Sequence, residues 1–553
     1  MNTKTENKIC VNCEKQFEIN SGDLDLYQKV GLEIPEQCFF CRMKQYLAFS
    51  IFGKFRKGAS SLSGESLITV LPERKTYPIY TSHEWWSDAW DPMAFGQEYD
   101  SERPFFDQLK ELQGKIPRPH QAGKNNVNCD WCEDVWDSKN CYLSRALAKC
   151  DNLNYGYRVL DAKDSFDVAI SFHIQNCYDC LTCHSSFNLN FSENSRDCID
   201  SFFLFDCRNC QNCFMSWNLR NKQYCIKNKQ YTKEEYEVEI KKLKLDSYKS
   251  LENLRAEFAN ILRNEVVHRE NFNLKSAGST GNYLNNCDKC SNCFTWDDSQ
   301  NCRNCLRGLF SKDSIDQAVS WHTELSGSNS AVNGGYQIKN SIYSVGRYSE
   351  YIDLCEEVEY CFGCVGLKKK KYCILNKQYS KEDYESLKDK IISDMKSRGE
   401  YGLFMPYFMS VCDYNFSNGI IYFPDTTKNE VVKKGGYWSE EDLSSHDGIS
   451  SLDLPDSIQD TDSSVSNQAL ICPESNFRFN ISPAEYEFHK RKGFALPREH
   501  FDLRIIKKAR KTAVVKSYPY KCFYCKKEIS AYYPPEWGYQ KIACEDCYKQ
   551  NIA

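Results

Sequence analysis

The 553-residue sequence predicts a mainly β protein with some α-helix. Three observations lead to this fold class. CxxC pairs stand near both ends of the chain, 21 of the 31 cysteines fall between about residues 125 and 375, and two internal repeats relate distant segments. We therefore expect two cysteine-rich β-solenoid blocks with helical caps, flanked by duplicated small modules. The expected domains are an N-terminal module, a first block with its cap, a second block with its cap, an acidic disordered linker and a basic C-terminal module, at 1–120, 121–275, 276–434, 435–470 and 471–553.

The N-terminal module begins with two CxxC pairs, in ICVNC and QCFFC. Its four cysteines are Cys10, Cys13, Cys38 and Cys41. Four thiolates form the tetrahedral set that zinc prefers and leave no open position for a substrate. The pattern therefore predicts a structural zinc site.

The C-terminal module carries the same kind of motif in KCFYCK and ACEDCY. Its four cysteines are Cys522, Cys525, Cys544 and Cys547. A zinc ion here would hold together a fold too small to bury a core of its own. Two zinc ions per chain are expected in total.

The two modules are related by a constant offset of 462 residues. Cys10 aligns with Cys472, Gly31 with Gly493 and Arg42 with Arg504, and the register continues to Tyr77 and Tyr539. Each copy keeps one four-cysteine set and has lost the other. The two degenerate sets are Cys472, Ser475, His500 and Leu503 in the C-terminal copy, and Ser60, Ser63, Ser82 and Trp85 in the N-terminal copy. Neither set offers four good ligands, so one zinc ion per module is expected, with Cys472 as an ordinary thiol.

These motifs carry a resemblance to known families. The N-terminal CxxC, FxI, Pro and CxxCR pattern resembles a small zinc-binding treble-clef domain of many bacterial proteins. The C-terminal motif resembles a zinc-ribbon domain in which about seventeen residues separate the two CxxC pairs, with eighteen here. More broadly, HEWWSDAWDPMAFG, RPFFDQLKEL, KQYCIKNKQYTKEEYE and EYGLFMPYF resemble an uncharacterised cysteine-rich family of small-genome, uncultivated bacteria. The resemblance spans most of the chain and implies an architecture without an activity.

A second repeat, at an offset of 148 residues, organises the cysteine-rich middle. The segment KQYCIKNKQYTKEEYE at 222–237 matches KKYCILNKQYSKEDYE at 370–385, and each match predicts a helix that begins at a capping box. Asn recurs directly before Cys, which is typical of stacked solenoid coils with aligned turn residues, although the coil period is irregular. These residues are Asn140, Asn176, Asn209, Asn212, Asn286, Asn292, Asn301 and Asn304.

Three segments, 177–183, 207–213 and 287–293, read CxxCxxC. An iron–sulfur centre would need a further Cys followed by Pro, and more zinc is conceivable where His173 and His184 flank three thiols. Burial of the thiols as small apolar residues is favoured, because the repeat places Val358 opposite Cys210. The alternatives of further metal remain open.

Charge separates sharply near the C-terminus. Residues 435–470 hold eight acids and no Lys or Arg, whereas 488–527 hold thirteen basic residues. A basic module with exposed aromatic residues could contact nucleic acid. The candidate contacts are Lys490, Arg491, Lys492, Lys507, Lys508, Arg510, Lys511, Lys521, Lys526 and Lys527.

No P-loop, GxSxG, HExxH or dinucleotide fingerprint occurs, and no small-molecule cofactor is indicated. No signal-peptide pattern and no apolar run of membrane-spanning length is found, so a cytoplasmic protein with reduced thiols is expected. The favoured function is a non-enzymatic zinc-binding scaffold or adapter that presents a solenoid surface to a macromolecular partner. The alternatives are a nucleic-acid-binding protein acting through the basic C-terminal module and a carbohydrate-active β-solenoid enzyme.

Overall fold

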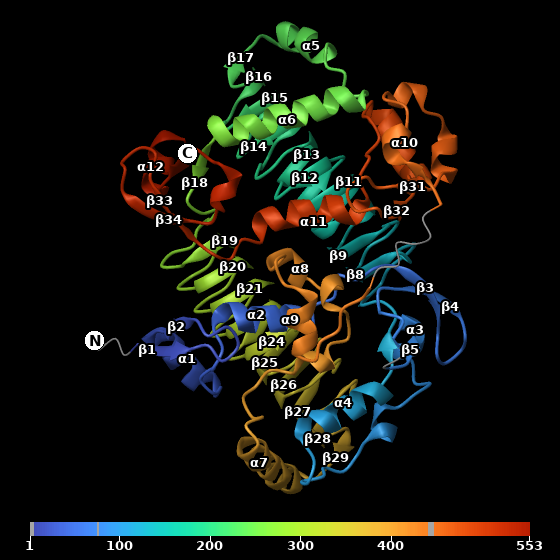
Figure 1. Ribbon diagram of the computed structural model, residues 1–553, viewed down its shortest axis with the longest axis vertical. Coiled ribbons are helices and arrows are strands. Elements are labelled where there is room, and N and C mark those ends of the chain that lie inside the picture. Colours follow the sequence, from blue (N-terminus) through green and yellow to red (C-terminus); the bar gives the residue numbers. More distant parts are fainter. Residues whose placement is uncertain (1–4, 75–76, 441–446, 553) are drawn as a thin grey trace. The chain divides into compact units, whose positions relative to one another are not determined.

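The computed structural model describes residues 5–74, 77–440 and 447–552, which form two compact units (Figure 1). Unit 1 contains Met1–Gln121 and Phe272–Ser439, and unit 2 contains Ala122–Asn271 and Glu440–Ala553. Each unit thus combines one terminal module with one cysteine-rich block, the N-terminal module with the second block and the C-terminal module with the first. No helix in the described ranges has the length and apolar character needed to cross a bilayer.

The prediction of mainly β structure with some helix is confirmed. Each unit contains one large mixed sheet of eleven strands. The sheet of unit 2, here called the first ladder, consists of β7 (Gly123–Lys124), β8 (Cys132–Trp136), β9 (Ser144–Ala148), β10 (Asp151–Asn154), β11 (Tyr157–Gln175), β12 (Tyr178–Leu181), β13 (His184–Asn190), β14 (Ile199–Phe205), β15 (Gln211–Trp217), β16 (Gln223–Ile226) and β17 (Lys229–Gln230).

The sheet of unit 1, here called the second ladder, has the same plan. It consists of β19 (Gly281–Asn285), β20 (Ser291–Asp297), β21 (Arg303–Leu309), β22 (Ile315–Trp321), β23 (Thr323–Glu324), β24 (Gly327–Ser330), β25 (Gly334–Lys339), β26 (Val345–Glu350), β27 (Val358–Phe362), β28 (Lys371–Ile374) and β29 (Lys377–Gln378).

Strands in both ladders pair in parallel at a nearly constant register. Cys213 pairs with Cys225 and Cys361 with Cys373, in each case twelve residues further along the chain. One step of the second ladder is shorter, because Gly334 pairs with Val345, eleven residues on. Each ladder ends in one antiparallel hairpin, β16–β17 and β28–β29.

The backbone of the first ladder turns at every third residue. From Asp134 to Lys227, every third residue has a positive φ, and Asn and Asp occupy many of these positions because they tolerate the left-handed conformation. All eight Asn residues predicted at turns have this conformation. Several of their side chains bond along the ladder axis, as from Asn209 to Asn221 and from Asn292 to Asn304.

The residue that follows a left-handed turn residue is buried through most of both ladders, with exposed exceptions near their ends such as Lys222. All 21 cysteines between residues 125 and 375 are buried, so each CxxCxxC segment supplies three successive inward side chains. The Cys213 thiol donates to the carbonyl of Gln211 at 3.4 Å. One step earlier, the Ser201 hydroxyl donates to the carbonyl of Ile199 at 2.8 Å and accepts from the Cys213 N–H at 3.0 Å. Cys and Ser therefore fill equivalent inward positions.

Helices follow each ladder as the capping boxes predicted. Thr232 caps α5 (Lys233–Lys241) in a complete box with Glu235, and Ser380 caps α7 (Lys381–Ser397) by accepting from the Asp383 N–H. In unit 2, α6 (Tyr248–Asn264) follows α5 and buries Leu251, Phe258, Ile261 and Leu262. Unit 1 also contains β5 (Ile79–Tyr80), η1 (Pro92–Phe95), α4 (Phe105–Lys115), β6 (Arg118–Pro119), η2 (Tyr407–Met409), η3 (Tyr414–Phe416), α8 (Gly419–Tyr422) and α9 (Lys428–Lys433).

The prediction of a disordered linker at 435–470 is wrong for residues 447–470, which form part of a core. Residues 441–446 lie outside the described ranges. Residues 447–470 bury Leu454, Ile458 and Val465 in one core with Tyr486, because apolar residues are interspersed among the acids. The carboxylate of Asp456 accepts a hydrogen bond from the Lys249 N–H at 2.8 Å. The elements of this segment are β30 (Ile449–Ser450), η4 (Ser451–Asp453), η5 (Ile458–Asp460), η6 (Ser463–Asn467) and the start of β31 (Leu470–Ile471).

Candidate metal centres

Each terminal module contains two copies of one local motif, a hairpin whose turn is a CxxC-type loop, followed by a helix. The N-terminal elements are β1 (Glu6–Ile9), β2 (Gln16–Ile19), α1 (Ser21–Val30), α2 (Phe39–Leu47), β3 (Arg56–Ala59), β4 (Ser66–Thr69) and α3 (Ser82–Trp86). The C-terminal elements are β31, β32 (Arg478–Phe479), α10 (Pro483–Lys492), α11 (Phe501–Thr512), β33 (Tyr518–Lys521), β34 (Glu528–Ala531), η7 (Pro535–Trp537), β35 (Lys541–Ala543) and α12 (Glu545–Asn551).

All four loops close with the same hydrogen bonds, whatever residue stands at the first ligand position. The residue at that position is Cys10, Ser60, Cys472 or Cys522. Its N–H donates to the carbonyl five residues on, and its carbonyl accepts from the N–H four residues on. That fourth residue has a positive φ in every loop and is Glu14, Gly64, Asn476 or Lys526. The duplication found in the sequence is therefore also a duplication of backbone geometry.

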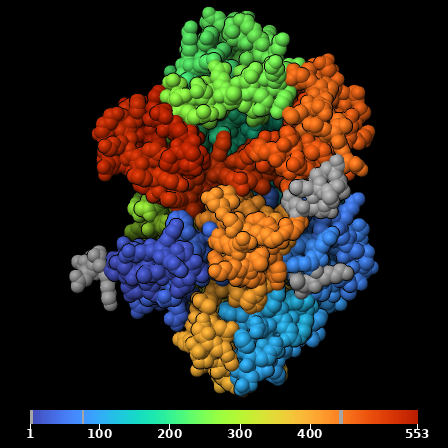
Figure 2. Space-filling model, viewed as in Figure 1, coloured from blue at the N-terminus to red at the C-terminus, as the bar shows by residue number. Residues whose placement is uncertain are grey.

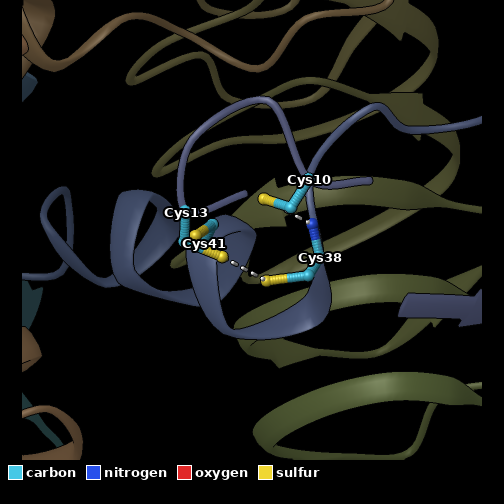
Figure 3. A group of neighbouring side chains, drawn as sticks. All are labelled: Cys10, Cys13, Cys38 and Cys41. Carbon is cyan, nitrogen blue, oxygen red and sulfur yellow. Dashed lines mark hydrogen bonds between the residues drawn. The ribbon is translucent and has the colours of Figure 1, made fainter. Parts of the chain in front are cut away.

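The first four-cysteine group is Cys10, Cys13, Cys38 and Cys41, whose sulfur atoms face one another (Figure 3). The four sulfurs lie within 4.8 Å of one another, and those of Cys13 and Cys38 are 3.7 Å apart. The Cys38 N–H donates to the Cys10 sulfur at 3.3 Å. Cys38 is the N-cap of α2, so the helix fixes the second pair of ligands.

The second group, Cys522, Cys525, Cys544 and Cys547, has the same construction. The sulfurs of Cys525 and Cys544 are 3.9 Å apart, and the Cys544 N–H donates to the Cys522 sulfur at 3.3 Å. Cys544 is the N-cap of α12. Cys525 is exposed, so this group lies at the surface of its unit. Both groups predicted from the sequence are assembled in space and could each hold a metal ion.

Hydrogen bonds to sulfur favour a thiolate in each group, which is the form that binds metal. The bond from the Cys41 thiol is the main cause that lowers the pKa of Cys38 to about 5. Burial opposes ionisation of Cys522, but backbone N–H donors, first that of Cys544, still lower its pKa to about 6. Each four-cysteine group thus contains at least one thiol that ionises readily.

The degenerate loops are held by other contacts. The Ser60 hydroxyl donates to a carboxylate oxygen of Glu84 at 2.5 Å, and the Thr81 N–H donates to the same oxygen at 2.8 Å. Burial raises the pKa of Glu84, but these donors and Ser63 together lower it to about 2. In the C-terminal copy, the His500 ring stacks on Phe501, and its Nδ1 accepts from the Asp502 N–H at 3.1 Å. Sequence reasoning missed Glu84, whose position two residues after Ser82 was the available signal.

Each module docks on the ladder of its own unit through a buried arginine and aspartate. In unit 1, Arg42 of α2 lies 2.8 Å from Asp316 of β22, which also accepts from the Tyr27 hydroxyl at 2.5 Å. In unit 2, Arg504 of α11 lies 2.8 Å from Asp167 of β11. Arg42 and Arg504 are the pair related by the 462-residue repeat, so the two docking contacts are equivalent.

The ten basic residues proposed as nucleic-acid contacts do not form one free surface. Lys508 is paired with Asp167 and Asp179 of the first ladder, and Lys511 is paired with Glu193. Several others also have partners or packing contacts within unit 2. Lys507 pairs with Glu474 and Glu499, Lys492 bonds to Asn188 and the carbonyl of Asn176, Lys490 bonds to the carbonyl of Ile458, and Arg491 lies over the Phe488 ring. Arg510 is not free either.

Exposed basic residues remain beside the second four-cysteine group. Lys521, Lys526 and Lys527 are exposed, and so are the neighbouring Phe523 and Tyr524. The Lys526 ammonium donates to the carbonyl of Phe523 at 2.7 Å and lies over its ring. Three of the ten predicted contacts therefore gather around one loop of the second four-cysteine group.

No protein-family model and no curated protein matches the chain. Among solved structures, a putative acetyltransferase from Desulfovibrio desulfuricans G20 is similar over 48% of this chain and 69% of its own, with 10% sequence identity and a TM-score of 0.09. A similarity this weak carries no conclusion about fold or function.

Proposed function

We propose that the protein is a non-enzymatic scaffold in which two structural zinc ions stabilise terminal modules docked on two β-solenoid blocks. The carrying observation is the pair of closed four-cysteine groups, one in each module, on loops with the same backbone hydrogen bonds. Four thiolate ligands complete a zinc coordination sphere and leave no position for a substrate or water. Each ion would act as a staple, and the free faces of the ladders would be available to a macromolecular partner.

The spacing of the sulfur atoms supports zinc. Four sulfurs about 2.3 Å from a central ion in a tetrahedron lie about 3.8 Å from one another. The separations of 3.7 Å in the first group and 3.9 Å in the second agree with that value. The soft thiolate set also favours zinc over calcium or magnesium, which prefer oxygen ligands.

The regular register supports a β-solenoid as the architecture of each ladder. Parallel pairing to the residue twelve positions on, a turn at every third residue and a buried residue after most turns are what four-sided coils of twelve residues require. The inward positions are closed by thiols and hydroxyls bonded to backbone carbonyls, as at Cys213 and Ser201. A packed interior of this kind suits a rigid support.

Metal analysis of the full chain tests the zinc assignment. Anaerobically purified protein is expected to contain two zinc ions per chain and no visible absorption band. The Cys522→Ser protein is expected to lose one ion. The control is Cys472→Ser, which removes the thiol at the first position of the degenerate loop in the same module and is expected to keep both ions. Iron with charge-transfer absorption, or four or more zinc ions per chain, contradicts the proposal.

A second function is favoured by the exposed rim of the C-terminal module. Lys521, Lys526 and Lys527 beside Phe523 and Tyr524 supply the cations and rings that hold phosphates and stack bases. We propose single-stranded nucleic acid as the partner of this rim. Changing the three lysines to glutamine should weaken a gel shift with a single-stranded oligonucleotide and flatten its salt dependence.

The matched control changes three exposed lysines that lie elsewhere, Lys233, Lys381 and Lys390, and should leave the gel shift unaltered. Equal binding by both triple variants, or binding that does not depend on salt, rules out the rim as a nucleic-acid site. Either result leaves the zinc assignment standing, because the metal analysis is independent of it.

A further inference from the structure

Unit 2 contains a cavity of about 350 Å³ between the first ladder, α6 and α11. In the space-filling view, teal ladder residues lie at the bottom of a hollow between α6 in light green and α11 in red (Figure 2). Part of its wall is apolar, with Phe191 and Phe203 on the ladder side and Leu251 and Phe258 on α6. A cavity of this size and lining can enclose the apolar part of a small molecule.

The charges that line the cavity are almost fully paired. Six basic side chains and five carboxylates line it, and all five carboxylates are paired with a basic side chain from the same lining. Five of the six basic residues are used in this way: Arg504 with Asp167, Lys508 with Asp167 and Asp179, Arg255 with Asp179 and Glu252, Lys507 with Glu499, and Lys511 with Glu193. Within the described part of the chain, the sixth, Arg498, has no carboxylate partner.

Arg498 is held in place but its charge is only partly satisfied. Its side chain is buried, with the residue 3% exposed, and Nη2 donates to the carbonyls of Leu454 and Pro455 at 3.3 and 2.7 Å. Nε and Nη1 are buried and have no hydrogen-bond partner among the described residues. The nearby carboxylate of Asp456 is bonded to the Ser247 hydroxyl and the Lys249 N–H instead.

Such an arrangement is costly unless an anion completes it. A buried guanidinium without a counter-charge loses hydration that two carbonyl contacts do not replace. Burial also lowers the pKa of Arg498, against the smaller opposing effects of Tyr248 and Asp456. The guanidinium carbon lies 4.8 Å from the centre of the Tyr248 ring, so the charge is fixed at the edge of the cavity.

We propose that this cavity binds a small organic anion, in which an oxyanion pairs with the Arg498 guanidinium and an apolar body lies against Phe191, Phe203 and α6. The oxyanion is a carboxylate or a phosphate, both of which match the planar donor edge of a guanidinium. This site is independent of the metal centres and adds a ligand to the proposed scaffold.

Isothermal titration calorimetry on the full-length, metal-loaded protein tests the site with defined probes. Phenyl phosphate and benzoate separate the two oxyanions, and the one that matches the site is expected to bind more tightly than inorganic phosphate. Phenol, which keeps the ring and lacks the charge, is expected to give no binding. Absence of binding by both aromatic anions at millimolar concentration, or equal binding by phenol, overturns the proposal.

Variants locate the binding within the cavity. Arg498→Met should weaken the bound aromatic anion about tenfold or more, since a charged hydrogen-bonding partner is lost, and Arg498→Lys should retain part of the affinity. Arg491→Met removes an exposed arginine of the same module and should have no effect. Ala259→Phe places a ring into the cavity from α6 and should abolish binding while Arg498 is unchanged.

The set of variants remains a test of the site even if the Arg498→Met protein does not fold. In that case Arg498→Lys and Ala259→Phe carry it, and unchanged affinity in both overturns the assignment. Unchanged affinity in a folded Arg498→Met protein overturns it directly.

Discussion

Replacing Arg504 with methionine tests how the C-terminal module is held on the first ladder. Its guanidinium nitrogens lie 2.8 Å from Asp167 and 3.1 Å from Glu485, and each of the three side chains is at least nine-tenths buried. Methionine keeps much of the length and apolar contact of the arginine stem but removes its charge. The substitution therefore isolates the ionic part of the docking contact.

The expected loss of unfolding free energy depends on which partners the carboxylates of Asp167 and Glu485 keep after the substitution. Removing one partner of a buried ion pair typically costs about 3–5 kcal/mol, because the other charge stays buried. Asp167 would still have Lys508 at 3.1 Å, and Glu485 would still accept from the Tyr155 hydroxyl at 2.7 Å. We therefore expect the lower end, about 3 kcal/mol, for unit 2. Arg42→Met should cost more, about 4–5 kcal/mol for unit 1, because among the described residues Asp316 would keep only the hydrogen bond from the Tyr27 hydroxyl.

Urea unfolding with hydrogen-exchange mass spectrometry measures both losses, since exchange assigns them to α11 or α2. Adding Asp167→Asn to Arg504→Met should restore part of the stability by neutralising a buried charge. The exposed control Arg491→Met should change stability by less than about 0.5 kcal/mol. If Arg504→Met behaves like this control, or if the double variant is less stable than the single one, the docking contact does not have the role assigned to it.

Three further predictions concern the first ladder. Changing Cys207, Cys210 and Cys213 together to serine should leave a folded protein with two metal ions, because serine can make the same bond to a backbone carbonyl; loss of metal in elemental analysis would contradict this. The pKa of Glu133 is raised to about 8, mainly by burial, and therefore exceeds its value in the unfolded chain. The protein should then lose stability as the pH rises between about 4.5 and 8. Glu133→Gln should raise the melting temperature at pH 9 and leave it unchanged at pH 4. The pKa of His184 is lowered to about 3, mainly by burial, so the protein should lose stability as the pH falls from about 6.5 towards 3. His184→Gln should reduce the fall in melting temperature between pH 7 and pH 5.

The terminal metal groups could be predicted because their signal is local. Two ligands of each CxxC pair lie three residues apart, and only the fold of a small module is needed to join two pairs. The coil period could not be seen from cysteine spacing, because inward positions accept several small or apolar residues. After Cys183 the inward side chains are Ser186, Leu189, Ser192, Ser195 and Cys198. A search for small or apolar residues at every third position, rather than for cysteine alone, is the signal that reveals the period.

The remaining differences depend on contacts between distant residues. The count of acids in 435–470 predicted disorder, yet Ile458 packs with Tyr486 of α10, and an acid count says nothing about such a core. The charge of 488–527 predicted a free basic face, but Lys508 and Lys511 pair with acids more than 300 residues earlier in the chain. Arg498 gave no sequence signal at all, since its distinguishing feature is the lack of a carboxylate in a three-dimensional lining.

The two copies of the module separate the role of the metal from the role of docking. In the N-terminal copy, the docking residue Arg42 directly follows Cys41 of a four-cysteine group. In the C-terminal copy, the equivalent Arg504 directly follows Leu503, at the degenerate position, and still pairs with an aspartate of its ladder. The docking contact therefore does not need a metal ion at the adjacent loop.

A metal ion bound at a four-cysteine group would add local closure of the loops that carry it. The degenerate loop at Ser60 keeps the same backbone hydrogen bonds without a cysteine. There the Ser60 hydroxyl bonds to the Glu84 carboxylate, in the position where a cysteine sulfur would bind an ion. Chelation should then loosen the loops at Cys522 and Cys544 while α11 stays protected from exchange, because its ion pair with Asp167 is independent of the second metal site. Loss of protection in α11 together with the metal would show that docking and metal binding are one cooperative unit.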